Sequence, residues 1–348
     1  MSGHSFAARS DAILGFYGVI GFRSSSYWHK ARRCSPAPSS LEGLPEEADL
    51  VVVGAGIFGL CTAIHVASLA PHLSIVVLEK SFPGAGSTGR SGGIIYVNDE
   101  YLPGSECNFA NFAAWLQELG LHSVLAWGPL GRPARELEYP AYLVNPQLLV
   151  DRLADVGQGM GVRLIAHSPV HHIAFGDAHI SVAARRCELR ASHVVLAAGG
   201  EFAAEFFREL KIVFTQEHCV AVEVENPLDL PWNFAKILDP ATDDFVWGRT
   251  LSSNKFLFGA RVSGAVEPTE KMACILQSMH ASVPSIKVTR VLAHWTGDID
   301  RLTYSDSWRV FELGSCCRLF FAAGFNGQGL LGGYAAALDV ARRIVHIQ

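Results

Sequence analysis

Three glycines, Gly54, Gly56 and Gly59, lie in the stretch VVVGAGIFGL with the spacing G-x-G-x-x-G. They follow an apolar, β-branched run and precede residues with helical spacing, which predicts a turn from a strand into a helix. In such a turn the first glycine permits the tight bend, the second lets the backbone approach a pyrophosphate, and the third lets the helix pack on the strand. The free N–H groups of the helix start, at Ile57 and Phe58, would face the phosphates with a favourable dipole.

An acidic residue, Glu79, ends the next apolar run and is followed by Lys80. A carboxylate about 20 residues beyond the glycines is placed to hold the ribose hydroxyls of a dinucleotide. This combination favours a dinucleotide site over a merely tight turn between a strand and a helix. The carboxylate would also repel a 2′-phosphate, which argues against NADP.

A second glycine cluster, GAGSTGRSGG at 84–93, follows Glu79 almost at once. A loop of this kind can extend along the diphosphate of FAD toward the flavin, whereas an NAD-binding fold usually continues into another helix and strand. Taken alone, the cluster is equally compatible with a surface loop. Its candidate FAD contacts are Ser87, Thr88, Gly89, Arg90, Ser91, Gly92 and Gly93.

The stretch AAGFNGQGLLGGYAAALDVARRIV at 322–345 predicts a strand, a glycine-rich turn and a helix. A helix start aimed at the flavin would stabilise negative charge on the reduced ring, and Asn326 or Gln328 could hydrogen-bond it. The alternative is a helix whose glycines let it pack closely on a sheet. The candidate contacts of this third turn are Gly324, Asn326, Gly327, Gln328 and Gly329.

Only one such dinucleotide fingerprint, the glycines together with an acidic residue at the end of the second strand, is present in the sequence. Enzymes that pass electrons from NAD(P)H to a flavin usually need a second nucleotide site. We therefore expect electrons to enter from an organic substrate and to leave to oxygen or another acceptor.

The elements that would hold these turns follow from the hydrophobic spacing. We expect strands at 49–53, 74–79 and 319–323, several short strands over 162–197, and a strand-rich region over 212–295. Helices are expected at 57–70, 106–120, 146–156 and 331–346, the third starting from Asn145 as cap and Pro146 in its first turn.

This order predicts an α/β fold, a Rossmann-like FAD/NAD(P)-binding domain with a strand-rich (α+β) substrate domain inserted. The FAD-binding domain is expected at 48–100, 141–205 and 312–348, and the substrate domain at 101–140 and 206–311. Residues 1–47, with a Pro/Ser-rich and then acidic end, are expected to be a flexible leader and linker.

The composition narrows the function classes. The chain has 348 residues, with 28 Lys+Arg against 33 Asp+Glu. No basic stripe is present, which argues against nucleic acid as a partner. The eight cysteines include no C-x-x-C and no His/Cys cluster at zinc spacing, so no metal site is expected and the thiols are interpreted as mostly buried.

No run of about 18 or more apolar residues occurs, so no membrane-spanning helix is expected. Residues 1–41 are rich in Ser and Arg and contain one acid, Asp11. This composition fits either an organellar transit segment or a flexible leader. The expected location is the cytoplasm, with an organelle left open.

Together these motifs resemble the D-amino-acid oxidase (DAO) superfamily of FAD-dependent oxidoreductases. The resemblance rests on their order along the chain, including HVVLAAGGEFA at 193–203 and HWTGDIDRLTYSD at 294–306. It is strongest to the gamma-glutamylputrescine oxidase and glycine-sarcosine oxidase branch, through the aromatic lead-in from Tyr27-Trp28 and the insert FVWGRTLSSNKFLFGAR at 245–261.

The resemblance adds further FAD contacts and shows departures. It implies that Val170 holds the adenine end and that Ala198 and Gly199 belong to the site. Gln328 stands where members often have His, and Leu257 where sarcosine oxidase has its oxygen-activating lysine. No cysteine stands where that enzyme attaches its flavin, which implies non-covalent FAD, and the chain is short between Leu119 and Tyr139.

The chemistry that the family implies is oxidation of the C–N bond of an amine or amino acid. The carbon next to nitrogen passes a hydride to flavin N5, and the resulting imine hydrolyses to a carbonyl compound. Such a step needs orientation and a dry pocket more than a dedicated acid or base.

Three residues are candidates for the substrate site. Arg249 is a candidate carboxylate anchor, because a guanidinium binds carboxylate bidentately, and an ordinary solvated arginine is the alternative. Trp295 and Tyr304 are candidate pocket walls, against a role as plain core. His294 is interpreted as a satisfied histidine, and Asp298, Asp300 and Arg301 as a solvated charged turn.

Two other functions remain open from the sequence. One is an NAD-dependent dehydrogenase that uses the single fingerprint. The other is a flavin-binding protein without turnover, which the short substrate lobe and Gln328 would suit.

Overall fold

The computed structural model describes residues 25–30, 46–97, 104–128, 130–131, 138–176, 178–185, 187–199, 211–225, 233–239, 244–261, 268–284, 286–305, 307–313 and 318–346. The chain divides into two compact units. Unit 1 comprises Met1–Lys30, Gly128–Ala141 and Thr215–Asp298. Unit 2 comprises Ala31–Trp127, Tyr142–Phe214 and Ile299–Gln348.

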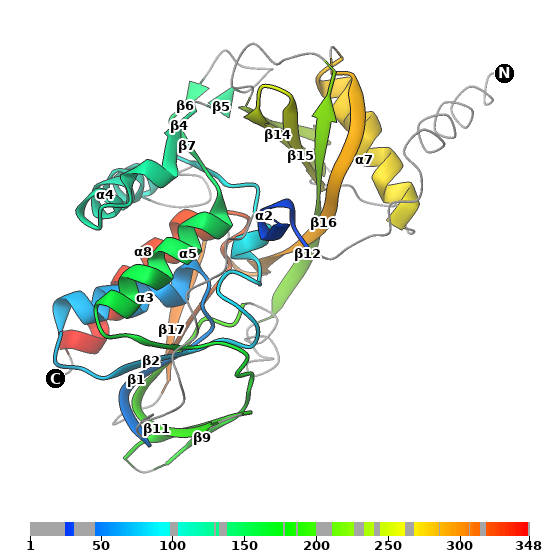
Figure 1. The fold of residues 1–348 in the computed structure, drawn as a ribbon. Helices are drawn as coiled ribbons and strands as arrows, with labels where there is room; N and C mark the ends of the chain where they lie inside the picture. Colours follow the sequence, from blue (N-terminus) through cyan, green and yellow to red (C-terminus); the bar gives the residue numbers. More distant parts are fainter. Residues whose placement is uncertain are drawn as a thin grey trace. The chain divides into compact units, whose positions relative to one another are not determined.

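Unit 2 is built on a sheet with parallel central strands (Figure 1). Its strands are β1 (Glu47–Val53), β2 (Ile75–Leu78), β8 (Arg163–Ile165), β9 (Val170–Phe175), β10 (Ile180–Ala184), β11 (Cys187–Leu196), β17 (Arg309–Leu313) and β18 (Arg318–Ala323). Among the described residues the order is β17-β18-β11-β1-β2-β8, with β9 and β10 joined to β11. In the middle, Val52 lies opposite Val195 and Val77 in parallel pairing. A strand covered on both faces needs a continuous apolar run, which β1 has.

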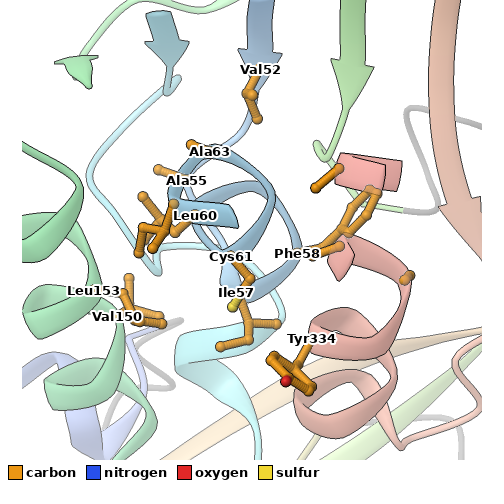
Figure 2. Close-up of a cluster of buried hydrophobic side chains, with 14 of the residues drawn as sticks. Val52, Ala55, Ile57, Phe58, Leu60, Cys61, Ala63, Val150, Leu153 and Tyr334 are labelled. Atoms are coloured by element: carbon orange, nitrogen blue, oxygen red, sulfur yellow. The ribbon is translucent and has the colours of Figure 1, made fainter. Parts of the chain in front are cut away.

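Helices cover this sheet. They are α3 (Ile57–Leu69), α5 (Pro146–Gly159) and α8 (Gly329–His346), and a further helix, α4 (Ser105–Glu118), packs on α8. Figure 2 shows α3 between α5 and α8. Val150 and Leu153 lie on α5, and Cys61 of α3 faces Tyr334 of α8. Residues 57–67 of α3 are all buried. Most of this helix is therefore covered on every side, unlike an amphipathic helix with one exposed face.

The predicted start of α5 is confirmed. The side chain of Asn145 accepts hydrogen bonds from the N–H groups of Gln147 and Leu148, and Pro146 occupies the first turn. These bonds satisfy two of the four N–H groups that a helix start leaves without an internal partner.

A small sheet completes unit 2. It consists of β3 (Ile94–Tyr96), β7 (Ala141–Val144) and β4 (Leu125–Trp127), in that spatial order. Two single 3-10 turns lie at Thr88–Arg90 and His122–Val124. The N–H of Val144 donates to the carbonyl of Gly93, which ties the end of the second glycine-rich loop to β7.

Unit 1 contains a second, largely antiparallel sheet. Its strands, in spatial order, are β16 (Val288–Leu302), β12 (Ile212–Val224), β15 (Lys255–Arg261), β14 (Asp244–Ser252), β13 (Asn233–Asp239), β5 (Leu130–Gly131) and β6 (Glu138–Tyr139). One face packs on α7 (Pro268–Ser282), whose Ile275, Leu276 and Met279 share an apolar cluster with Val246 and Phe258. Strands β12 and β16 continue into unit 2.

The strand-rich region expected over 212–295 is confirmed, but it also contains helix α7, which the sequence did not predict. The buried residues of α7 repeat at helical intervals. The segment follows several predicted strands, however, and its apolar face can be identified only from the sheet on which it packs.

The expected leader at 1–47 also needs correction within the described residues. Tyr27–Lys30 forms a helical turn, α2, and Trp28 is only 4% exposed. The ammonium group of Lys30 donates to the carbonyl of Leu292 on β16, at 2.6 Å. This part of the N-terminal segment therefore belongs to unit 1.

The boundaries of the units differ from the expected domain boundaries. Residues 101–127, 206–214 and 299–311 fall in unit 2 rather than with the strand-rich unit. The physical reason is clear for α4, since Phe112 and Trp115 pack against Tyr334 of α8.

The thiols are less uniformly buried than expected. Cys61 and Cys219 are buried, Cys187 and Cys274 are partly exposed, and Cys107 is exposed. Cys34, Cys316 and Cys317 lie outside the described residues. Within the described part of the chain, no helix combines the length and the apolar character needed to cross a bilayer.

A histidine is enclosed among aromatic rings where α3, α4 and α8 pack together. His65 is 6% exposed, and its ring centroid lies 4.6 Å from that of Trp115 and 5.5 Å from that of Tyr334. Among the described residues its Nε2 has no hydrogen-bond partner. Burial lowers the pKa of His65 to about 4, and the nearby Arg342 contributes in the same direction.

This burial predicts acid sensitivity. His65 is protonated near pH 6.5 in the unfolded chain but only near pH 4 in the folded chain, so the free energy of unfolding falls as the pH drops between these values. The difference corresponds to about 3 kcal/mol in total. Denaturant unfolding above and within this window should show a smaller loss of stability for His65→Leu than for the wild type. An equal loss in both proteins would contradict the assignment.

Candidate functional site

The turn between β1 and α3 is too tight for side chains at two positions. Gly54 has φ +108°, and a Cβ there would lie 2.4 Å from the carbonyl oxygen of Ala197. A Cβ on Gly59 would lie 2.1 Å from the carbonyl oxygen of Gly54 and 3.0 Å from the Cβ of Ala197. The first and third glycines of the fingerprint are therefore required by the close approach of α3, β1 and the end of β11.

The start of α3 meets the second glycine-rich loop. The hydroxyl of Thr88 accepts a hydrogen bond from the N–H of Ile57 at 3.1 Å. A Cβ on Gly56 would stand 3.0 Å from the same hydroxyl oxygen. An oxygen atom thus lies at the positive end of the helix, where peptide N–H groups bind phosphate oxygens in other proteins.

Glu79 lies directly beyond β2, next to this turn. Its carboxylate accepts hydrogen bonds from the N–H groups of Ala55 at 2.9 Å and Ser81 at 2.8 Å. Burial raises the pKa of Glu79, and the two backbone hydrogen bonds oppose that shift. Lys80, the neighbouring predicted residue, is exposed.

The second glycine-rich loop is anchored to the first turn. The N–H of Gly84 donates to the carbonyl of Ala55 at 3.0 Å, and the N–H of Gly89 donates to the carbonyl of Gly84 at 3.1 Å. Arg90 Nε donates to the carbonyl of Ala85 at 3.4 Å. These bonds fix the run from Ser87 to Arg90 over the start of α3.

The third turn follows β18 and leads into α8. Gly324, Asn326 and Gly327 all have positive φ, at +86°, +46° and +83°, which makes the turn dependent on residues that tolerate the left-handed region. Gln328 is 7% exposed, and its carbonyl accepts a hydrogen bond from the N–H of Gly332.

Asp300 fixes this third turn, a role that the sequence analysis missed. Its Oδ2 accepts a hydrogen bond from the N–H of Gly324 at 2.6 Å, and its carbonyl accepts one from Asn326 at 3.0 Å. Burial raises the pKa of its carboxyl group. The expected solvated turn of Asp298, Asp300 and Arg301 is therefore wrong, since these residues lie in β16.

The third turn and the first meet through α8. A Cβ on Gly333 would lie 2.9 Å from Cγ2 of Ile57, and the rings of Phe58 and Phe325 have centroids 6.4 Å apart. The three glycine-rich turns, separated by up to about 270 residues of sequence, thus share one neighbourhood around the first turn of α3.

The remaining predicted FAD contacts also lie in unit 2. Val170 is the first residue of β9 and is partly buried. Ala198 and Gly199 follow β11, and Gly199 has φ +92°. The N–H of Ala197, just before them, donates to the carbonyl of Val53 at 2.8 Å. Unit 2 holds every residue of the predicted FAD set.

The three predicted substrate residues have different surroundings. Arg249, on β14 of unit 1, is 7% exposed, and its guanidinium carbon lies 5.4 Å from the ring centroid of Trp28. Burial lowers the pKa of Arg249 to about 10. Trp295, also in unit 1, is 2% exposed and belongs to the core, whereas Tyr304, in unit 2, is 52% exposed.

A protein-family model matches most of the chain. The family described as DAO, FAD dependent oxidoreductase, matches residues 49–140 and 122–343. The chain belongs to the DAO family of FAD-dependent oxidoreductases. Its glycine-rich turns, Glu79 and most of α8 lie inside the matched region.

Solved structures share the DAO fold. Glycine oxidase from Geobacillus kaustophilus superposes with a TM-score of 0.68 at 18% identity, over 87% of this chain and 96% of that chain. L-amino acid deaminase from Proteus vulgaris, lacking its specific insertion sequence, gives 0.67 at 15% identity, over 90% and 94%. L-proline dehydrogenase from P. horikoshii gives 0.65 at 14% identity, over 87% and 94%.

A short sequence match adds another relative. L-2-hydroxyglutarate dehydrogenase from Escherichia coli (strain K12) is 40% identical over 58 residues, and so is the enzyme from Salmonella houtenae. The match covers 16% of this chain and 14% of those enzymes.

The residues of unit 2 have the chemistry that FAD requires. A diphosphate needs backbone N–H groups and a close approach, which the start of α3 offers because Gly56 carries no side chain. A ribose needs a hydrogen-bond acceptor, which the carboxylate of Glu79 supplies at the end of β2. The donor set therefore fits the cofactor of the family.

The packing predicts that Gly59→Ala loses both stability and FAD. The added methyl group would overlap the carbonyl of Gly54, so α3 must shift, at a cost of about 1–3 kcal/mol. Gly159→Ala is the matched control, since a Cβ there meets nothing within 4 Å. Thermal unfolding and the FAD content per chain should fall for the first variant and not for the second. Equal FAD content in both variants would contradict this reading.

The hydrogen bond to Gly324 predicts that Asp300 controls FAD affinity. Asp300→Leu leaves a partly buried N–H without its acceptor, and we expect FAD to bind roughly tenfold more weakly. Asp300→Asn keeps an oxygen acceptor and should lose less. Quenching of FAD fluorescence by the apoprotein measures both, and an unchanged affinity in Asp300→Leu would refute the role.

Proposed function

We propose that this protein binds FAD non-covalently in unit 2 and oxidises the C–N bond of an amine or amino acid. The observation that carries the proposal is the meeting of three glycine-rich turns around the first turn of α3. Family membership adds the cofactor, and the relatives named as amino acid deaminase and glycine oxidase suggest the class of substrate.

Each turn has a separate role in this proposal. The N–H groups of Gly56 and Ile57 would bind the diphosphate, with the hydroxyl of Thr88 beside them. The carboxylate of Glu79 would accept hydrogen bonds from the ribose in place of those from Ala55 and Ser81. The turn Gly324, Asn326, Gly327, Gln328 and Gly329, held by Asp300, would donate to the flavin.

Flavin supplies the difficult step when it is bound, since its N5 accepts a hydride from the carbon next to nitrogen. The chain's own residues have to orient the substrate and exclude water. Arg249 is the proposed anchor, because a buried guanidinium binds a carboxylate more strongly than an exposed one. Oxygen or another acceptor would take up the two electrons.

The proposal of non-covalent FAD rests on the cysteines. No cysteine stands where sarcosine oxidase attaches its flavin, and burial raises the pKa of the Cys61 and Cys219 thiols, which makes these two less reactive. Denaturation with acid should therefore release the flavin into solution. A yellow pellet and a colourless supernatant would contradict it.

A 2-hydroxy acid is the second candidate substrate. The short match to L-2-hydroxyglutarate dehydrogenase favours it, and Arg249 would anchor the carboxylate of either class. Oxidation of a C–O bond in place of a C–N bond would use the same flavin.

Anaerobic reduction of the bound flavin tests the proposal. The panel should contain primary, secondary and N-methyl amines, amino acids and 2-hydroxy acids. We expect at least one amine or amino acid to bleach the flavin. Bleaching only by 2-hydroxy acids would select the second candidate, and no bleaching by any compound would favour a flavin protein without turnover.

Arg249→Leu separates anchoring from cofactor binding. We expect unchanged FAD content, because Arg249 lies in unit 1, and a KM for the carboxylated substrate raised at least about tenfold. The KM for the corresponding substrate amide should change little. Steady-state kinetics measure both, and equal losses with acid and amide would contradict the anchor.

A further inference from the structure

Three parallel strands of unit 2 end side by side at one edge of the sheet. Val53, the last residue of β1, is paired with Leu78, the last residue of β2. Leu78 is paired in turn with Ile165, the last residue of β8. Ligands of open sheets bind outside the carboxyl ends of parallel strands. The residues that follow β1, β2 and β8 therefore form one row along a ligand-binding edge.

The first two positions of this row belong to the proposed FAD site. The start of α3, after β1, would bind the diphosphate, and Glu79, after β2, would bind the adjoining ribose. Neighbouring strands lie about 4.8 Å apart, which is comparable to the step from a ribose to its base. The adenine would therefore lie over the end of β8.

His167 is the side chain that the chain exposes just after β8. The residues before and after it, Ala166 and Ser168, are buried, whereas His167 is exposed. The N–H of His167 donates to the carbonyl of Ser81 at 3.1 Å. The N–H of Ser168 donates to the carbonyl of Glu79 at 2.8 Å. These two bonds fix the backbone of His167 against the loop that carries the ribose ligand.

The backbone of His167 has an uncommon conformation. Its φ is +55°, in the left-handed region that glycine adopts without cost and that other residues rarely adopt. Residues held in such regions by their surroundings cluster at ligand-binding sites, where the side chain has a use that offsets the strain. Glycine would satisfy this backbone, so the presence of an imidazole points to a role for the ring.

The imidazole lies close enough to Glu79 to act on its carboxylate. Burial raises the pKa of Glu79, and the two backbone hydrogen bonds, Lys80 and His167 all oppose that rise. An aromatic ring is thus within reach of the group that would hold the ribose. Nucleotide bases stack on flat rings, histidine included, whereas a lysine side chain has no ring to offer.

We propose that His167 stacks on the adenine of FAD and contributes to the selection of FAD over FMN. The inference rests on the proposed function, because it needs FAD in unit 2, and it deepens that function by naming a further cofactor contact. FMN ends at its phosphate and has no adenosine. It would gain nothing from the imidazole.

The affinities of the full-length protein for the two flavins test this contact. FAD and FMN are each titrated into flavin-free protein, and binding is followed by quenching of the flavin fluorescence. His167→Gly should bind FAD roughly tenfold more weakly and FMN with unchanged affinity. His167→Phe restores a flat ring and should recover most of the affinity for FAD.

A matched control separates the ring from the backbone conformation. Lys211 is also a non-glycine residue in the left-handed region, with φ +47°, but it does not follow β1, β2 or β8. Lys211→Gly should bind FAD and FMN as the wild type does. Loss of FAD affinity in this variant would attribute the effect of His167→Gly to the backbone and overturn the inference.

Thermal unfolding separates a contact with FAD from a structural role. Without FAD, His167→Gly should unfold at the wild-type temperature or above it, because glycine relieves the left-handed conformation. Saturating FAD should then raise the unfolding temperature less in His167→Gly than in the wild type, because a ligand stabilises the folded state according to its affinity.

Three results would overturn the inference. They are an unchanged affinity for FAD in His167→Gly, an equal loss of FAD and FMN affinity, and a lower unfolding temperature of this variant without FAD. All of these measurements are made without turnover. A flavin that no substrate bleaches, with FAD affinity that still depends on His167, would contradict the proposed oxidation and leave the contact standing.

Discussion

The first turn of α3 is the constraint on which the rest of unit 2 depends. A helix start leaves peptide N–H groups without internal acceptors, and here it is enclosed by β1, the second glycine-rich loop and α8. The hydroxyl of Thr88 satisfies the N–H of Ile57, while the carboxylate of Glu79 satisfies that of Ala55. The N–H donors at this positive helix end are what a diphosphate would require, and the carboxylate acceptor of Glu79 beside them is what a ribose would require.

Backbone contact explains how such a site tolerates wide variation in sequence. The approach of α3 to β1 and β11 is set by missing side chains at Gly54 and Gly59, and that of α8 by Gly333. The groups that would bind the cofactor are mostly peptide N–H groups, so neighbouring side chains are free to differ. A TM-score of 0.68 at 18% identity to glycine oxidase agrees with this reading.

Local signals in the sequence predicted the parts of the site that local physics determines. The strand-turn-helix around Gly54, the cap at Asn145 and the helix after Gly329 each depend on residues within a few positions. Asp300 could not be found in this way, because its role comes from its hydrogen bond with Gly324, which the fold brings near. Helix α7 and the turn at Trp28 were missed for the same reason, since their apolar faces have meaning only against the sheet of unit 1.

A crystal structure of the protein grown with FAD tests the central claim most directly. The account predicts the diphosphate at the N–H groups of Gly56 and Ile57, the ribose hydroxyls on Glu79, and the flavin beside the turn at Asn326 to Gly329. Density for FAD at another place, or a site around α3 that stays empty at saturating FAD, would contradict it.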